Sequence, residues 1–125
     1  TDMNYSQQRK KIRSLLQDRF TLERKMLGAK PPFIAASLVL YRNVCGKPNC
    51  ACKAGHTHGP YTYLSFKEKG KTRLKMVPRL QLEDTAAAVG RYREFQQALK
   101  RVRRLNRQAE ASFKSLRVSL IRRAA

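Results

Sequence analysis

The chain has 125 residues, and its 28 Lys and Arg against 8 Asp and Glu give it a formal net charge of +20. Hydrophobic residues make up 42% of the sequence, which suits a single domain over residues 1–125 and excludes a wholly disordered basic tail. Because so high a charge repels itself, we expect an anionic partner, with nucleic acid ahead of an anionic membrane or an acidic protein.

The sequence lacks the signals of export and of a membrane anchor. Its first residues contain no apolar stretch typical of a secretion signal, and its longest apolar run, 33–41, is far shorter than the roughly 20 residues that span a membrane. Its three cysteines are an odd number, which disfavours a disulfide scaffold. We therefore expect a cytoplasmic protein with reduced cysteines and no membrane partner.

The first predicted element is a helix over 4–27. Apolar residues recur there near one helical face, and Gly28 with the two prolines at 31–32 supplies the stop signal. The face consists of Ile12, Leu15, Leu16, Leu22, Met26 and Leu27. Such a face needs a partner against which to pack.

A small antiparallel sheet is predicted over 33–78. The segment 34–41 has the composition of a strand, while 61–66 and 73–77 alternate with period two around a loop, 67–71, that contains Gly70. The connector 44–60, between the first strand and this hairpin, is too rich in turn-forming residues for either helix or strand.

The last predicted element, over 80–123, contains no proline. One unbroken helix there would be roughly 65 Å long, longer than the domain to which it belongs. Part of its apolar seam over 95–120 would then meet the N-terminal helix, and the rest would meet a second copy or a partner protein. The alternative is a helical hairpin with breaks near Gly90 and Asn106. The seam consists of Phe95, Leu99, Val102, Leu105, Ala109, Phe113, Leu116 and Leu120.

All the cysteines and histidines of the chain lie within 45–58. Zinc takes four such ligands in a tetrahedron, and three cysteines with one histidine form one of its closed structural sets. The predicted ligands are Cys45, Cys50, Cys52 and His58, with His56 as the alternative histidine. The competing interpretation is a surface loop with three reduced thiols. With zinc, the prediction is an α+β fold: a small three-stranded antiparallel sheet stapled by the metal, an N-terminal helix and a long basic C-terminal helix.

Two sequence blocks carry a family resemblance: Cys-Gly-Lys-Pro-Asn-Cys-Ala-Cys over 45–52 and His-Gly-Pro-Tyr over 58–61. Together with Gly70–Arg73 and Val77–Pro78, they resemble a family of short prokaryotic proteins classified as a domain of unknown function. Its members are often encoded near transposases or other mobile-element genes. The resemblance covers roughly residues 37–105 and favours His58 over His56 as the ligand. It implies a metal site and a mobile-element setting, but no activity.

The basic residues concentrate in three places, and after Glu94 only Glu110 is acidic. An ordinary solvated helix mixes charges of both signs, so this excess predicts contact with phosphates. The candidates are Arg9, Lys10, Lys11 and Arg13 on the first helix, Lys71, Arg73 and Lys75 on one strand face, and Lys100, Arg101, Arg103, Arg104 and Arg107 on the last helix, continued by Lys114, Arg117, Arg122 and Arg123. Arg42 and Lys47 complete the predicted set.

The sequence shows no arrangement of acids, phosphate-binding loop or nucleophile that would indicate an enzyme. We therefore expect a nucleic-acid-binding accessory protein that contacts mainly phosphates, as a subunit of a mobile-element or other nucleoprotein complex. The alternative is a structural or adaptor protein that assembles through its long helix, with incidental nucleic-acid contact. The sequence does not distinguish DNA from RNA as the partner.

Overall fold

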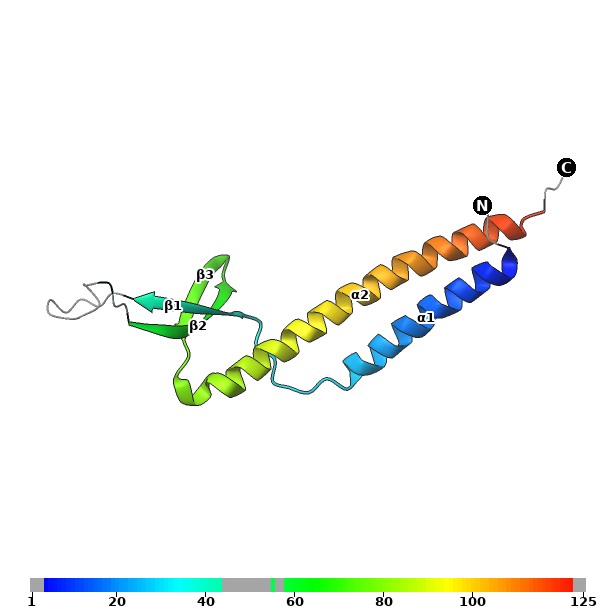
Figure 1. Cartoon of the computed structure of the whole chain (residues 1–125). Helices are drawn as coiled ribbons and strands as arrows, with labels where there is room; N and C mark the ends of the chain where they lie inside the picture. The colour runs from blue at the N-terminus through cyan, green and yellow to red at the C-terminus, as the bar shows by residue number, and fades with distance from the viewer. Residues whose placement is uncertain (1–3, 44–54, 56–57, 123–125) are drawn as a thin grey trace. The chain divides into compact units, whose positions relative to one another are not determined.

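The computed structural model of the protein describes residues 4–43, 55 and 58–122 (Figure 1). The elements follow the order α1 (Tyr5–Leu27), β1 (Ser37–Asn43), β2 (His58–Glu68), β3 (Lys71–Met76), the 3₁₀ turn η2 (Arg79–Gln81) and α2 (Leu82–Leu120). The predicted α+β class is confirmed, with an N-terminal helix, a three-stranded antiparallel sheet and a long C-terminal helix. Within the described residues, no helix is both long and apolar enough to cross a membrane.

The chain divides into two compact units. The helical unit consists of Thr1–Ala29 and Glu94–Ala125, and the sheet unit consists of Lys30–Arg93. The helix α2 contributes to both, because it begins in the sheet unit and ends in the helical unit. Whether residues 1–125 behave as a single domain stays a prediction.

The start of α1 is closed by a reciprocal cap. The Asn4 side chain accepts a hydrogen bond from the Gln7 backbone N–H at 2.8 Å, and the Gln7 side chain accepts one from the Asn4 N–H at 3.1 Å. These two bonds satisfy backbone donors that a helix start would otherwise leave unpaired. At the other end the Gly28 N–H donates to carbonyls of the last turn. The helix predicted over 4–27 therefore forms, with Asn4 as its cap.

The helix α2 runs unbroken through 39 residues, which corresponds to about 58 Å. The alternative of a helical hairpin was wrong, because α2 breaks at neither Gly90 nor Asn106. A single glycine inside a helix costs only about 1 kcal/mol, which the neighbouring alanines, good helix formers, help to offset. The Asn106 side chain accepts a hydrogen bond at 3.0 Å from Nη1 of Arg19 on α1, so it stabilises the helix pair instead of ending a helix.

In the helical unit α1 runs antiparallel beside the C-terminal part of α2 (Figure 1). The Tyr5 hydroxyl donates to the Ser119 carbonyl at 2.9 Å near one end of the pair. The core between the helices consists of four buried residues, Ile12, Val102, Leu105 and Ala109. The N-terminal helix is therefore the partner of the middle of the α2 seam.

The sheet has the order β1-β2-β3, with both pairs antiparallel. The first strand begins at Ser37, three residues later than predicted, because the chain before it is bound to α2: the Ile34 N–H donates to the Ala88 carbonyl at 3.2 Å. The ring of Phe33 meets the edge of Tyr92 with centroids 6.3 Å apart. Val77, Ala88 and Val89 form the buried core of this unit.

The hairpin loop between β2 and β3 is shorter than the predicted 67–71. Only Lys69 and Gly70 separate the strands, with φ of 51° and 78°. Two positive φ values in a two-residue connection match the twist of antiparallel strands. Both strands are consequently longer than predicted, and Lys71 is already paired with Glu68.

Candidate nucleic-acid interface

The helical unit carries most of the uncompensated positive charge. In its described residues, fifteen Lys and Arg stand against Asp18, Glu23, Glu94 and Glu110. Two of these acids are engaged within their own helices: Glu23 lies 3.2 Å from Nε of Arg19, and Glu110 lies 3.3 Å from Nζ of Lys114. Exposed pairs of this kind contribute under about 1 kcal/mol each and leave the excess charge of the unit in place.

Four of the predicted cations form one surface on α2, which we call the basic arc: Lys100, Arg103, Arg104 and Arg107. At 100° per residue they fall within about 100° of the helix circumference, on the side opposite the buried Val102, Leu105 and Ala109. All four are exposed. Burial of the opposite side against α1 thus turns the arc outward.

Two more cations lie on either side of the arc. Arg101 is about 100° from Lys100 in one direction, and Arg117 is about 100° from it in the other. Both are exposed. Arg101, predicted together with the four cations of the arc, therefore lies on a flank of the helix.

Three uncharged residues on the same side of α2 were missed by the sequence analysis. Gln97, Gln108 and Ala111 lie within about 80° of Lys100 and are exposed. The helical period of 100° per residue, applied to the polar side of α2, identifies these three positions from the sequence alone.

The four basic residues predicted on α1 do not form a single patch. Arg9, Lys10, Lys11 and Arg13 are all exposed. Because successive helical residues are 100° apart, these side chains are distributed over about 200° of the helix circumference. They contribute to the general positive charge of the unit, and only some of them can meet one ligand at the same time.

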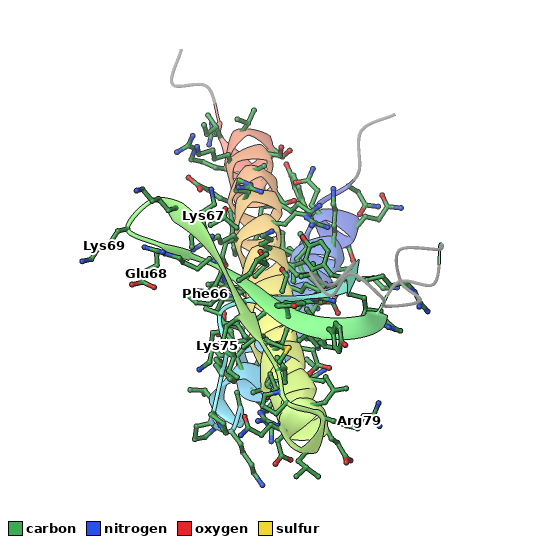
Figure 2. The ribbon with its side chains drawn as sticks, turned by 90° about the vertical axis from the view of Figure 1, so that its left-hand side faces the viewer. Phe66, Lys67, Glu68, Lys69, Lys75 and Arg79 are labelled. Atoms are coloured by element: carbon green, nitrogen blue, oxygen red, sulfur yellow. The ribbon has the colours of Figure 1, made fainter. Side chains whose placement is uncertain are left out.

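In the sheet unit, Lys71, Arg73 and Lys75 lie on one face of β3, opposite Glu68, Phe66 and Leu64 of β2. All three cations are exposed. In Figure 2, Lys67, Glu68 and Lys69 gather at the hairpin tip, with Lys75 farther along β3. Because β3 is an edge strand, charged side chains there also hinder pairing with other chains. This second role weakens the set as evidence for a binding site.

Arg42 and Lys47 gain little support as binding residues. Nη1 of Arg42 donates to the Gly59 carbonyl at 3.2 Å, so the guanidinium is partly engaged in joining the ends of β1 and β2. Lys47 lies outside the residues that the structure describes.

The predicted metal site falls mostly outside the described residues, which do not include Cys45, Cys50, Cys52 or His56. His58 is the first residue of β2, and its backbone pairs with Asn43 at the end of β1. Within the described part of the chain there is no group of three His, Cys, Asp or Glu that could hold a metal ion.

The glycine after His58 has a firm structural role. Gly59 has a φ of +109°, and a Cβ there would lie 2.8 Å from the Tyr41 carbonyl oxygen and 2.8 Å from the Tyr61 nitrogen. Only glycine permits this approach of β2 to β1. The glycine of the His-Gly-Pro-Tyr block therefore allows the start of β2 to pair with the end of β1.

The fold and the charge define a small basic α+β protein. The family described as Domain of unknown function (DUF6788) matches residues 6–87, about two thirds of the chain, and the chain belongs to this family. No curated protein and no solved structure matches the chain. The match starts earlier and ends earlier than the resemblance over 37–105 suggested. The basic arc lies beyond the matched region.

Proposed function

We propose that the protein binds nucleic acid chiefly through phosphate contacts of the basic arc. The observation that carries this proposal is the outward arrangement of Lys100, Arg103, Arg104 and Arg107, none of which has an acidic partner among the described residues. Four exposed cations on adjacent turns repel one another, and a polyanion alongside them converts this repulsion into attraction. Three of the four are arginines, whose planar guanidinium can bind phosphate with two hydrogen bonds.

The proposed role is that of an accessory subunit without catalytic activity of its own. Its setting would be a nucleoprotein complex in the cytoplasm, such as that of a mobile element. Both the chemistry of the arc and the family resemblance support this assignment. Phosphate contacts exist in DNA and RNA alike, so the arc alone supports either polymer.

The dependence of binding on salt tests this proposal. If the arc, Arg101 and Arg117 neutralise about six phosphates, the logarithm of the association constant should fall by about five per tenfold rise in salt. Fluorescence anisotropy with a labelled nucleic acid over a range of salt concentrations measures this slope. A slope near zero, or no binding at low salt, would end the proposal.

We also propose that zinc closes the connector, held by Cys45, Cys50, Cys52 and His58. The supporting observation is the pairing of Asn43 with His58, because it brings both ends of the connector together. Three thiolates and one imidazole form a closed structural zinc set. The ion would act as a staple of the sheet unit.

Metal analysis of the purified protein, paired with histidine variants, tests the zinc site. We expect one zinc per chain in the unmodified protein and in His56→Ala, and loss of the metal in Cys50→Ser and His58→Ala. Retention of zinc by His58→Ala together with its loss from His56→Ala would transfer the ligand role to His56. If protein prepared in the presence of zinc contains no metal, the proposed zinc site is wrong and the three cysteines are free thiols.

A protein partner is the second candidate. The helical unit has an open hollow of about 470 Å³ whose apolar part is formed by Leu16, Ala109 and Phe113. Phe113 and Leu120 are 48% and 49% exposed, so part of the predicted seam is not covered by α1. If the protein is an adaptor, Leu116→Asp should abolish its assembly in analytical ultracentrifugation. This loss should then exceed any effect of the arginine variants on nucleic-acid binding. Under the nucleic-acid proposal, the arginine variants have the larger effect.

A further inference from the structure

The outward side of α2 combines two kinds of surface. Its centre holds Lys100, Arg104 and Ala111, which lie within about 40° of one another. Arg101 and Arg117 form its flanks, each about 100° from Lys100. A helix in a groove of a duplex faces base edges in front and a phosphate backbone on each side. We propose that this side of α2 enters the major groove of B-form duplex DNA, an inference that rests on the proposed function.

The dimensions of the helix fit this groove. A helix with its side chains is about 10–12 Å across, and the major groove is about 12 Å wide and 8.5 Å deep. From Lys100 to Ala111 the helix rises about 17 Å, which matches about five base pairs. On the other side α1 holds α2 through hydrogen bonds such as Arg19 to Asn106 at 3.0 Å. The helix is therefore supported from behind, and its outward side stays open.

Uncharged side chains on this side of α2 can read base edges, while the cations of the basic arc reach the phosphates. Glutamine forms two hydrogen bonds with adenine. Gln97 and Gln108 are exposed, and the structure gives neither of them a hydrogen bond or ion pair within the described residues. Ala111 has a small side chain, which permits close approach to the base edges and contact with a thymine methyl group.

Other polymers fit this surface less well. The major groove of an RNA duplex is too deep and narrow for side chains to reach its bases. Single strands are held largely by stacking on aromatic rings, and Phe113 is the sole aromatic residue within 97–115. It lines the hollow beside α1. Duplex DNA is therefore the partner that the geometry favours.

The first test compares polymers with the unmodified full-length protein. Anisotropy at one salt concentration would use DNA duplexes of about 20 base pairs, RNA duplexes of the same sequences, and the single strands. A further DNA duplex would carry glucosylated hydroxymethylcytosines, which fill the major groove and leave the phosphate charge unchanged. We expect plain duplex DNA to bind at least tenfold more tightly than each of the others. Equal or tighter binding of RNA, of single strands or of the glucosylated duplex would overturn the inference.

The second test is a bulky substitution that leaves the charge unchanged. Ala111→Trp should weaken binding to duplex DNA at least tenfold, because an indole at this position prevents close approach of the helix to the base edges. Gln17→Trp is the matched control, on an exposed position of α1 away from the buried Ile12, and should bind like the unmodified protein. Circular dichroism verifies that both variants stay helical.

Different results would contradict the groove inference and the proposed phosphate binding. If Ala111→Trp binds as well as the control while the steep salt dependence remains, the groove inference is wrong and phosphate binding stands. If no polymer shows salt-dependent binding, the proposed function itself is wrong, and the groove inference is wrong with it.

Discussion

Replacing Arg104 and Arg107 with alanine removes two of the four cations of the basic arc. If each cation neutralises one phosphate, the association constant varies as the salt concentration to the power of about −0.9 per contact. Relative to 1 M salt, one contact then contributes about fivefold to the affinity at 0.15 M and about fifteenfold at 0.05 M. The double variant should bind about 30-fold more weakly at 0.15 M and about 200-fold more weakly at 0.05 M.

The slope of the salt plot should change along with the affinity. With six contacts the logarithmic slope is about −5, and with four it becomes about −3.5. Alanine is the best helix former, so replacing exposed arginines by it should preserve α2. Anisotropy of a labelled duplex at four or more salt concentrations gives both the affinity and the slope.

The matched control removes the same charge from another part of the helical unit. Arg24 and Lys25 lie in the last turn of α1, and Arg24 lies 5.8 Å from the ring centroid of Phe20. If the arc binds the phosphates, Arg24→Ala with Lys25→Ala should change the affinity by less than about threefold, through long-range attraction alone. Equal losses in the two double variants would show that total charge drives binding, and would refute a localised site.

Three further predictions concern stability. Gly59→Ala should lower the free energy of unfolding by about 3 kcal/mol or more in urea titrations. Gly70→Ala should lower it by only about 1–2 kcal/mol, because φ is also positive there but a Cβ meets open space. Similar losses in the two variants would contradict the close approach of Gly59 to Tyr41. Leu105→Ala should lower the free energy of unfolding by about 2–5 kcal/mol, because it leaves a cavity between the helices. Val118→Ala, at an exposed position, should lower it by less than about 0.5 kcal/mol. A larger loss in Val118→Ala than in Leu105→Ala would disprove the helix packing. A strong chelator should lower the melting temperature if zinc staples the sheet unit, and an unchanged melting curve with complete removal of zinc would exclude a stabilising role.

Much of the fold follows from local sequence. The cap at Asn4, the stop at Gly28 and the apolar spacing between them define α1 closely, because each acts on neighbouring backbone groups. Period-two alternation likewise located β2 and β3, although their pairing extends both strands beyond the alternating segments. The connector predicted over 44–60 was too long, because its last three residues, 58–60, belong to β2, which pairs with β1 from His58 onward. The ligand role of its cysteines stays a prediction.

What local sequence could not decide was settled by contacts between distant segments. The start of β1 depends on the bond from Ile34 to Ala88, which lies 54 positions later in the chain. The Asn106 side chain lies inside α2 and accepts a hydrogen bond from Arg19, 87 positions earlier in the chain.

The candidate site shows the same division. The sequence by itself determined that the chain is strongly cationic and that its longest helix carries arginines among apolar residues. Only the tertiary structure decided which of them face outward, because packing of Val102, Leu105 and Ala109 against α1 selects one side of the helix for burial. The basic arc lies on the opposite side because a guanidinium without a partner is far more stable in water than in an apolar core.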